Sequence, residues 1–181
     1  MVYFKEVVYE KIFSLLLGVV LVVSLAACDL EQPSKEENQS KPVAESSVEK
    51  EDTFSLNETA VFSNLKFTAN EIKESNGEGF FTPDDGNVFV AVNFTVENIS
   101  DEEQNISSIL LFDAYVDDEK CEYSVNANCA FDSGTLDGSI APGKKMTGWY
   151  ALEVPKDWSN LEMHVSSNWL SGSSAKFVFT K

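Results

Sequence analysis

The 181-residue chain contains no arginine, and its basic residues are 13 lysines set against 30 aspartates and glutamates. The formal net charge is therefore −17 at pH 7. Proteins that bind nucleic acids need Lys and Arg to neutralise phosphates, so this balance argues against a nucleic-acid partner. It equally disfavours direct docking of the folded part onto an anionic bilayer.

The chain also has little of what catalysis needs. His164 is its single histidine, and no Gly-x-Ser-x-Gly, His-Glu-x-x-His, Cys-x-x-Cys or phosphate-binding glycine loop is present. His164 falls on the outward register of a short predicted strand, which predicts a solvated surface residue. We therefore expect no enzyme and no cofactor, with an envelope enzyme that uses His164 as the alternative.

Acidic residues cluster at three places: Asp84-Asp85, Asp101-Glu102-Glu103 and Asp117-Asp118-Glu119. Carboxylates of this kind can hold Ca²⁺, but an EF-hand requires alternating ligands and a glycine at fixed spacing. None of the clusters has that spacing. We interpret them as solvated loop charges and predict no metal site, and a divalent-metal-binding protein is the alternative.

The N-terminus has the pattern of an export signal. An apolar run from Ile12 to Ala27 carries no charge and is shorter than the roughly 20 residues of a spanning helix. It ends in Leu25-Ala26-Ala27-Cys28, which resembles the bacterial lipobox. In that motif the cysteine is acylated with diacylglycerol and the chain is cut just before it. The resemblance implies a signal peptide at residues 1–27 and a lipid anchor at Cys28; a plain signal peptide or an uncleaved anchor is the alternative.

The segment after Cys28 is polar. Glu, Ser, Lys and Gln dominate it, aromatic residues are missing from positions 29–52, and such a composition cannot bury enough apolar area to offset the entropy of ordering. We expect residues 28–55 to be the acylated cysteine followed by a disordered stalk.

The remaining residues, 56–181, read as one domain of strands. Apolar residues alternate with mostly polar ones at 65–69, 88–96, 146–154, 161–165 and 175–179, and a more continuous apolar run at 109–116 suggests a central strand. Turn signals such as Pro142-Gly143 separate the runs. No stretch keeps a helical period. The pattern predicts an all-β, immunoglobulin-like antiparallel β-sandwich of about seven to nine strands.

Two cysteines remain beside Cys28. Cys121 and Cys129 flank a plausible hairpin tip at residues 124–126, and exported domains meet oxidising conditions. We predict a disulfide between them; two free thiols, or a zinc site completed by His164, are the alternatives.

Large aromatic residues interrupt the polar register of two predicted strands. Phe89 and Trp149 both occupy positions at which their neighbours are polar or small. If the strands are adjacent, the two side chains form an outward aromatic surface suited to a sugar or a partner protein, with Trp158 close to it. The alternative is that a loop, such as the one that carries Trp158, covers them.

Three segments in order resemble a known family: GNVFVAVNFTVENIS, LLFDAYVDDEKCEY and IAPGKKMTGWYALEVPKD. They are similar to secreted Gram-positive lipoproteins with a domain of unknown function, whose immunoglobulin-like sandwich is similar to that of a mycobacterial immunoprotective antigen. Members often carry the label "telomeric repeat-binding factor", which the acidic charge contradicts. The resemblance implies the same sandwich over about residues 56–181 and supplies no catalytic residues. It departs from the family where Glu119 follows Asp118 in place of glycine.

Together these observations predict a lipoprotein anchored through Cys28 to the extracellular face of the cytoplasmic membrane. Its sandwich would be a non-enzymatic binding module of the envelope, with an envelope protein or a cell-wall glycan as its partner. A purely structural or antigenic surface protein is the further alternative.

Overall fold

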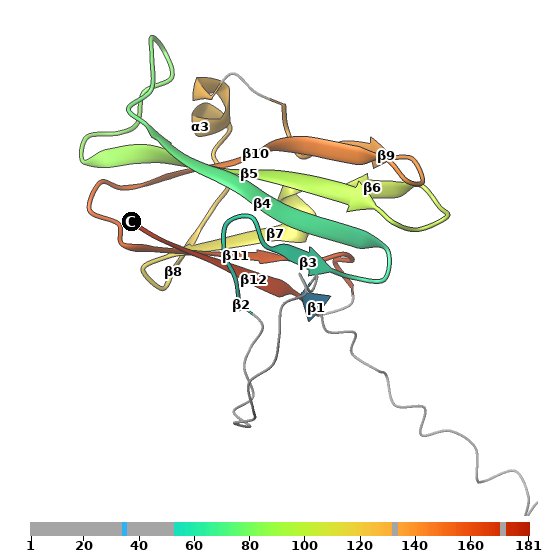
Figure 1. The fold of residues 1–181 in the computed structure, drawn as a ribbon. Helices are drawn as coiled ribbons and strands as arrows, with labels where there is room; N and C mark the ends of the chain where they lie inside the picture. The colour runs from blue at the N-terminus through green and yellow to red at the C-terminus, as the bar shows by residue number, and fades with distance from the viewer. Residues whose placement is uncertain (1–33, 36–52, 132–133, 171–172) are drawn as a thin grey trace, which may run out of the picture.

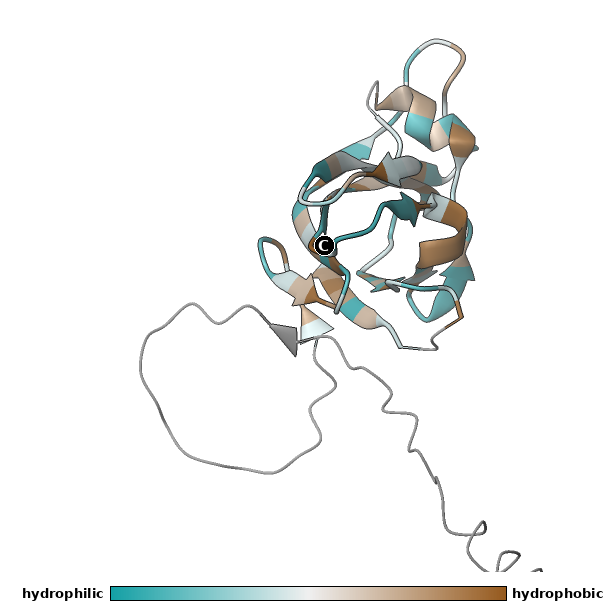
Figure 2. Ribbon diagram, turned by 90° about the vertical axis from the view of Figure 1, so that its right-hand side faces the viewer, coloured by the Kyte–Doolittle hydropathy of each residue, from teal (hydrophilic) through white to brown (hydrophobic). Residues whose placement is uncertain are grey.

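The computed structural model describes residues 34–35, 53–131, 134–170 and 173–181. The predicted signal peptide, Cys28 and most of the predicted stalk lie outside these residues. Within them the chain forms two large β-sheets that pack face to face around one core (Figures 1 and 2). No helix in this part of the chain is long and apolar enough to cross a membrane.

The first sheet has five strands in the order β1-β3-β4-β5-β10. Its centre is the long strand β5, which pairs antiparallel with β4 on one side and with β10 along its whole length on the other. The bounds are Ser34–Lys35 for β1, Thr59–Val61 for β3, Leu65–Ser75 for β4, Asn87–Asn98 for β5 and Lys145–Pro155 for β10.

The second sheet has the order β2-β12-β11-β7-β8. All its pairs are antiparallel except β12 with β2. The bounds are Thr53–Phe54 for β2, Phe112–Val116 for β7, Glu119–Cys121 for β8, Asn160–Val165 for β11 and Ala175–Thr180 for β12. A small third sheet pairs β6, Gln104–Ile106, with β9, Gly138–Ile140.

The core lies between the two large sheets, because each strand turns every second side chain inward. Aromatic rings fill its centre, and Phe94 contacts Phe112 and Phe177 in edge-to-face geometry at centroid distances of 5.4 Å and 5.3 Å. The predicted all-β, immunoglobulin-like antiparallel sandwich is therefore confirmed.

The domain begins earlier than residue 56, contrary to the prediction. Phe54 is fully buried and its ring lies 5.2 Å from that of Phe177. β2 therefore belongs to the sandwich, although only one apolar residue marks it in the sequence. β1 adds a further two-residue strand to the edge of the first sheet, against β3.

Two short helices were not predicted. α2, Ser108–Leu111, replaces the first half of the apolar run at 109–116, so the strand predicted there begins only at Phe112. The resulting β7 lies next to the outermost strand β8 and not at the centre of its sheet. α3, Val125–Ala130, replaces the hairpin tip predicted at residues 124–126 and packs on the outer face of the first sheet (Figure 1).

Candidate functional site

The aromatic surface predicted from strand register is not exposed. Phe89 does point away from the main core, yet its side chain is 0% exposed. With Ala91 of β5 and Ala151 of β10 it forms the floor on which Ala127 of α3 packs. The helix therefore covers Phe89, and the predicted binding role of this residue is wrong because a second, smaller core occupies the outer face.

Trp149 is half-buried at the margin of this second core. Its ring stacks on Phe131 with a centroid distance of 5.8 Å and an interplanar angle of 13°, and the Lys73 ammonium lies 5.0 Å from the ring centroid. In the strand register Trp149 is opposite Asn93, whereas Phe89 is opposite Glu153. The two residues are therefore not a cross-strand pair, and the Trp149 ring already contacts Phe131 and Lys73.

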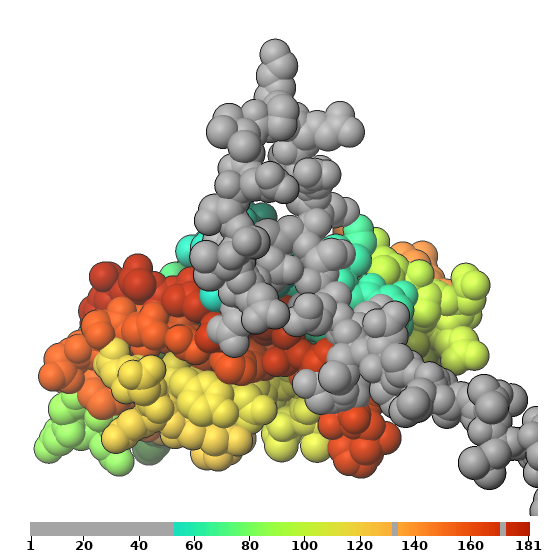
Figure 3. Space-filling model, turned by 90° about the horizontal axis from the view of Figure 1, so that it is seen from below, coloured from blue at the N-terminus to red at the C-terminus, as the bar shows by residue number. Residues whose placement is uncertain are grey.

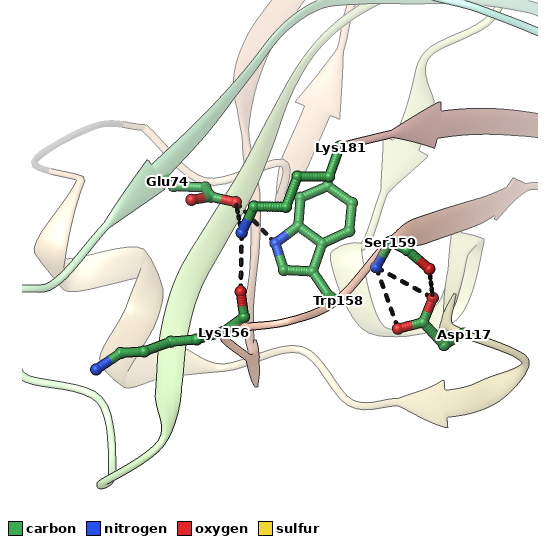
Figure 4. A network of polar contacts seen from close by, with 6 residues as sticks. All are labelled: Glu74, Asp117, Lys156, Trp158, Ser159 and Lys181. Carbon is green, nitrogen blue, oxygen red and sulfur yellow. Dashed lines mark hydrogen bonds and ion pairs between the residues drawn. The ribbon is translucent and has the colours of Figure 1, made fainter.

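Trp158 is also buried, at 4% exposure, and it does not cover Phe89 or Trp149. Its Nε1 donates a hydrogen bond of 2.8 Å to Glu74 Oε1, and Lys181 Nζ contacts the same carboxylate oxygen at 2.8 Å (Figure 4). The hydrogen bond from Lys181 leads the effects that lower the Glu74 pKa. Trp158 thus belongs to the main core, and Glu74 of β4 binds both Trp158 and Lys181.

Cys121 and Cys129 are free thiols, so the predicted disulfide is absent. Cys121 ends β8 and packs against the main core, with its Sγ 3.7 Å from the carbonyl oxygen of Glu153. Cys129 lies on α3 and is exposed. The prediction failed because the segment between them crosses the edge of the first sheet as a helix and does not turn back as a hairpin.

His164 lies on the outer face of the second sheet, which Figure 3 shows with β11 and β12 in orange to red. It is half-buried: its ring lies 5.2 Å from that of Tyr115, and its Nε2 is 3.5 Å from Glu162 Oε2. Among the described residues no three His, Cys, Asp or Glu side chains gather as a metal site, so the zinc alternative is not supported.

The acidic cluster at 117–119 has a structural role. Asp117 and Asp118 have φ of 49° and 71°, which makes them the two-residue turn of the β7–β8 hairpin. The Asp117 carboxylate accepts hydrogen bonds from the Ser159 hydroxyl at 2.6 Å and from the backbone N–H of Asn160 at 2.9 Å. The Ser159 hydroxyl is the main cause of a lowered Asp117 pKa. The turn therefore consists of Asp117 and Asp118, and Glu119, which stands where the resembling family has glycine, is the first residue of β8.

A pocket of about 240 Å³ opens where α2, β8 and the start of α3 meet the edge of the sandwich. We call it the edge pocket, and nine residues line it: Ile109, Phe112, Asp113, Lys120, Cys121, Glu122, Tyr123, Val125 and Tyr150. It combines aromatic rings, aliphatic groups and charges. None of the predicted aromatic binding residues lines it, and of the predicted disulfide pair only Cys121 does.

The floor of the edge pocket belongs to the core. Tyr150 of β10 stacks on Phe112 at 5.5 Å and meets Tyr123 edge-to-face at 5.3 Å. Burial, followed by the negative charges of Asp113 and Glu122, raises the Tyr150 pKa. Burial and the charge of Glu122 also raise the Cys121 pKa. The tyrosine and the thiol are therefore neutral at pH 7.

Two side chains that project into solvent form the walls. Ile109 of α2 is 75% exposed and Val125 of α3 is 68% exposed. The Asp137 carboxylate accepts a 2.9 Å hydrogen bond from the backbone N–H of Ser108, which fixes the start of α2. The Ser124 hydroxyl accepts from the N–H of Ala127 at 3.1 Å and caps α3. Both apolar side chains are thus held in place although little packs over them.

Charges surround the mouth. Lys120 and Asp113 form an ion pair of 2.8 Å, and Glu122 follows on the same segment. The hydrogen bond to Asp113 and the negative charge of Asp113 raise the Lys120 pKa. Sequence reasoning missed this site because its residues come from three distant segments; the one available signal was the unbroken apolar run 109–112, which has more apolar residues than a one-faced strand can bury.

The domain of unknown function DUF4352 matches residues 54–176. The chain belongs to the DUF4352 family. The match begins at the buried Phe54, which lies in β2. A comparison with curated proteins gives no match.

Solved structures share the fold. The DUF4352 domain superposes on ycdA, a candidate lipoprotein of Bacillus subtilis, with a TM-score of 0.53 and 16% identity, covering 65% of this chain and 36% of that one. A β-sandwich protein of Clostridium difficile gives 0.50 and 16% identity, covering 76% of this chain and 100% of that one. The secreted Mycobacterium tuberculosis protein MPT63 gives 0.48 and 14%, covering 74% and 100%. The chain thus spans about a third of ycdA.

Proposed function

We propose that this chain is a lipoprotein anchored through Cys28 to the extracellular face of the cytoplasmic membrane. Its DUF4352 sandwich acts as a non-enzymatic binding module, and the edge pocket is the binding site. The partner is a protein of the cell envelope.

The anchor rests on the sequence Leu25-Ala26-Ala27-Cys28 directly after an uncharged apolar run. Similarity to a candidate lipoprotein and to a secreted protein supports an extracellular location. Because the chain has a net charge of −17, anionic lipids would repel its surface. A lipid at Cys28 would hold the protein at the membrane despite this repulsion.

The observation that carries the binding role is the pair of exposed aliphatic walls. Ile109 and Val125 are exposed and line the same pocket as the buried ring of Tyr150. Hydrogen bonds from backbone N–H groups to the side chains of Asp137 and Ser124 hold the starts of both helices in place. A soluble domain gains no stability from apolar groups placed this way, whereas a partner that covers them gains buried area.

The anchor is tested by Cys28→Ser. The variant should appear in the medium or accumulate as the uncut precursor, since acylation precedes cleavage at this motif. Unchanged membrane retention together with normal processing would reject the anchor. A Cys129→Ser variant is the matched control, because Cys129 is exposed and lies far from the signal in the sequence.

The binding site is tested by a photo-cross-linking amino acid at Val125 in living cells, with Asp85 as an exposed control position. We expect a discrete adduct from position 125 alone, and its loss when Ile109→Asp is added. Adducts of equal yield at both positions, or an adduct that survives Ile109→Asp, would reject the edge pocket as the binding site.

A further inference from the structure

The size and the charge of the edge pocket indicate what enters it. Pockets for drug-sized ligands span about 300–1,000 Å³, so a pocket of about 240 Å³ fits one side chain and not a large ligand. Its charged lining consists of Asp113, Glu122 and Lys120. The carboxylates therefore outnumber the ammonium group by one.

Glu122 is the charge without a direct counterion. Lys120 already pairs with Asp113 at 2.8 Å, and within the described residues Glu122 forms no ion pair. Burial is the largest cause of the raised pKa of both Tyr150 and Cys121, and the negative charge of Glu122 adds to it at both groups. An incoming cation would meet Glu122 at the mouth and the rings of Tyr123 and Tyr150 at the floor, and aromatic faces attract cations.

We infer, on the basis of the proposed function, that the edge pocket receives a Lys or Arg side chain from a basic segment of the partner protein. The alkyl part lies between Ile109 and Val125, and the cationic head lies near Glu122 and the tyrosine rings. The net charge of −17 attracts a basic partner over long range, while the pocket selects one side chain.

The probes are three peptides that differ at one position: acetyl-Gly-Leu-Lys-Leu-Gly-amide, and the same sequence with Met or Glu in place of Lys. They are titrated into the full chain in non-ionic detergent at low salt, and the methyl NMR signals of Ile109 and Val125 are followed. We expect saturable shifts with the Lys peptide, at least threefold weaker binding of the Met peptide and no detectable shifts with the Glu peptide.

The matched variants are Glu122→Gln and Glu119→Gln, which remove the same charge from neighbouring exposed positions. Only Glu122 lines the pocket. Glu122→Gln should weaken the Lys peptide about two- to fivefold, in the range of an exposed ion pair, and Glu119→Gln should change it less. Equal weakening by both variants would show a general charge effect and overturn the inference.

The remaining outcomes separate this inference from the proposed function. If the Met or Glu peptide binds as tightly as the Lys peptide, the inference that the pocket receives a cationic side chain is wrong. The proposal that the edge pocket is a binding site would still stand. If no peptide shifts either methyl signal the inference is wrong, and the cross-linking at Val125 still decides the proposed function independently.

Discussion

At the scale of single residues, Tyr150 belongs to both the core and the edge pocket. Its ring is 3% exposed, stacks on Phe112 and contacts Tyr123. Removing it would lose core packing as well as a pocket surface, so binding and stability would change together. Ile109, Val125 and Glu122 are exposed, and changes there affect the pocket with little effect on folding.

Phe89→Ala should destabilise the protein by about 3–5 kcal/mol, the range for removing a buried phenylalanine ring. The ring is fully buried between the first sheet and α3, and its removal leaves a cavity. Urea unfolding followed by tryptophan fluorescence measures the effect. Phe80→Ala is the control, because Phe80 is 99% exposed and should change stability by less than about 0.5 kcal/mol. Equal effects of the two substitutions would contradict the second core.

Asp117→Asn should lower stability at neutral pH and have no effect in acid. Hydrogen bonds from Ser159 and Asn160 lower the pKa of the Asp117 carboxyl, so its charged form is favoured in the folded state. Because the folded-state pKa of Asp117 lies below the unfolded value near 3.8, the charged carboxylate stabilises the folded protein fully above that value. This stabilisation is lost as the pH falls through the folded-state pKa. Asparagine tolerates the left-handed backbone at this position.

The measurement is urea unfolding of the original protein and of Asp117→Asn between about pH 7 and pH 2. The two stability curves should run apart above pH 4 and converge below it. A difference that stays constant down to pH 2 would show that the charge of Asp117 does not cause the effect.

Strand register predicts correctly that Phe89 points to the outer face of the first sheet, and it predicts wrongly that the side chain is exposed to solvent. Strand alternation tells which side of a sheet a residue occupies, and Phe89 does point away from the main core. What covers that side depends on tertiary structure. Here the cover is α3, whose sequence VNANCA has small residues and no helical period to indicate it.

At the scale of elements, β10 is an edge strand whose free side is covered. The N–H of Ser124 donates to the carbonyl of Ala151 at 2.8 Å, and the N–H of Trp149 donates to that of Gly134 at 3.0 Å. Segments before and after α3 thus occupy backbone groups that would otherwise pair with another chain. The segment before α3, which pairs with β10 through Ser124, also brings Tyr123 and Val125 to the edge pocket.

Gly148→Ala should disturb this cover. A Cβ at position 148 would lie 2.7 Å from the carbonyl oxygen of Thr135 and 2.8 Å from that of Gly134, and backbone at this distance must move. We expect a loss of about 1–3 kcal/mol, as for overpacking, and faster amide exchange at Trp149. Gly134→Ala is the control from the same crossing, because its Cβ would meet only the Thr147 oxygen at 3.6 Å. Equal losses would contradict the close approach.

The long strands could be predicted from sequence, and the edge pocket could not. β5, β10, β11 and β12 repeat an apolar residue at every second position over six residues or more, which a half-buried strand requires. β2 has two residues and α2 has four, too few for any period to show. The pocket forms only because α2, β8 and the start of α3 meet at one edge of the sandwich. Local sequence patterns carry no information on which segments meet there.

At the scale of the whole molecule, charge repulsion opposes folding. The net charge is −17. Within the described residues, the ion pairs of Lys73, Lys120, Lys145 and Lys181 lie at surface positions where each contributes little, and the pair of Lys176 with Glu162 is half-buried. A compact chain of this charge repels itself, while the unfolded chain spreads the same charge over a larger volume. The absence of arginine removes the residue best suited to bidentate compensation of carboxylates.

Raising NaCl from about 0.01 M to 0.1 M should therefore raise the melting temperature by a few degrees. The Debye length falls from about 30 Å to about 10 Å, and the added salt screens the net repulsion more than it weakens the surface ion pairs. Circular dichroism of the full chain in non-ionic detergent measures it. CaCl₂ and MgCl₂ at one concentration are the control and should act alike, since the described residues hold no three-ligand acidic site. A fall in melting temperature with NaCl would show that local ion pairs outweigh the net repulsion, and a larger rise with Ca²⁺ than with Mg²⁺ would point to a specific calcium site in the acidic loops.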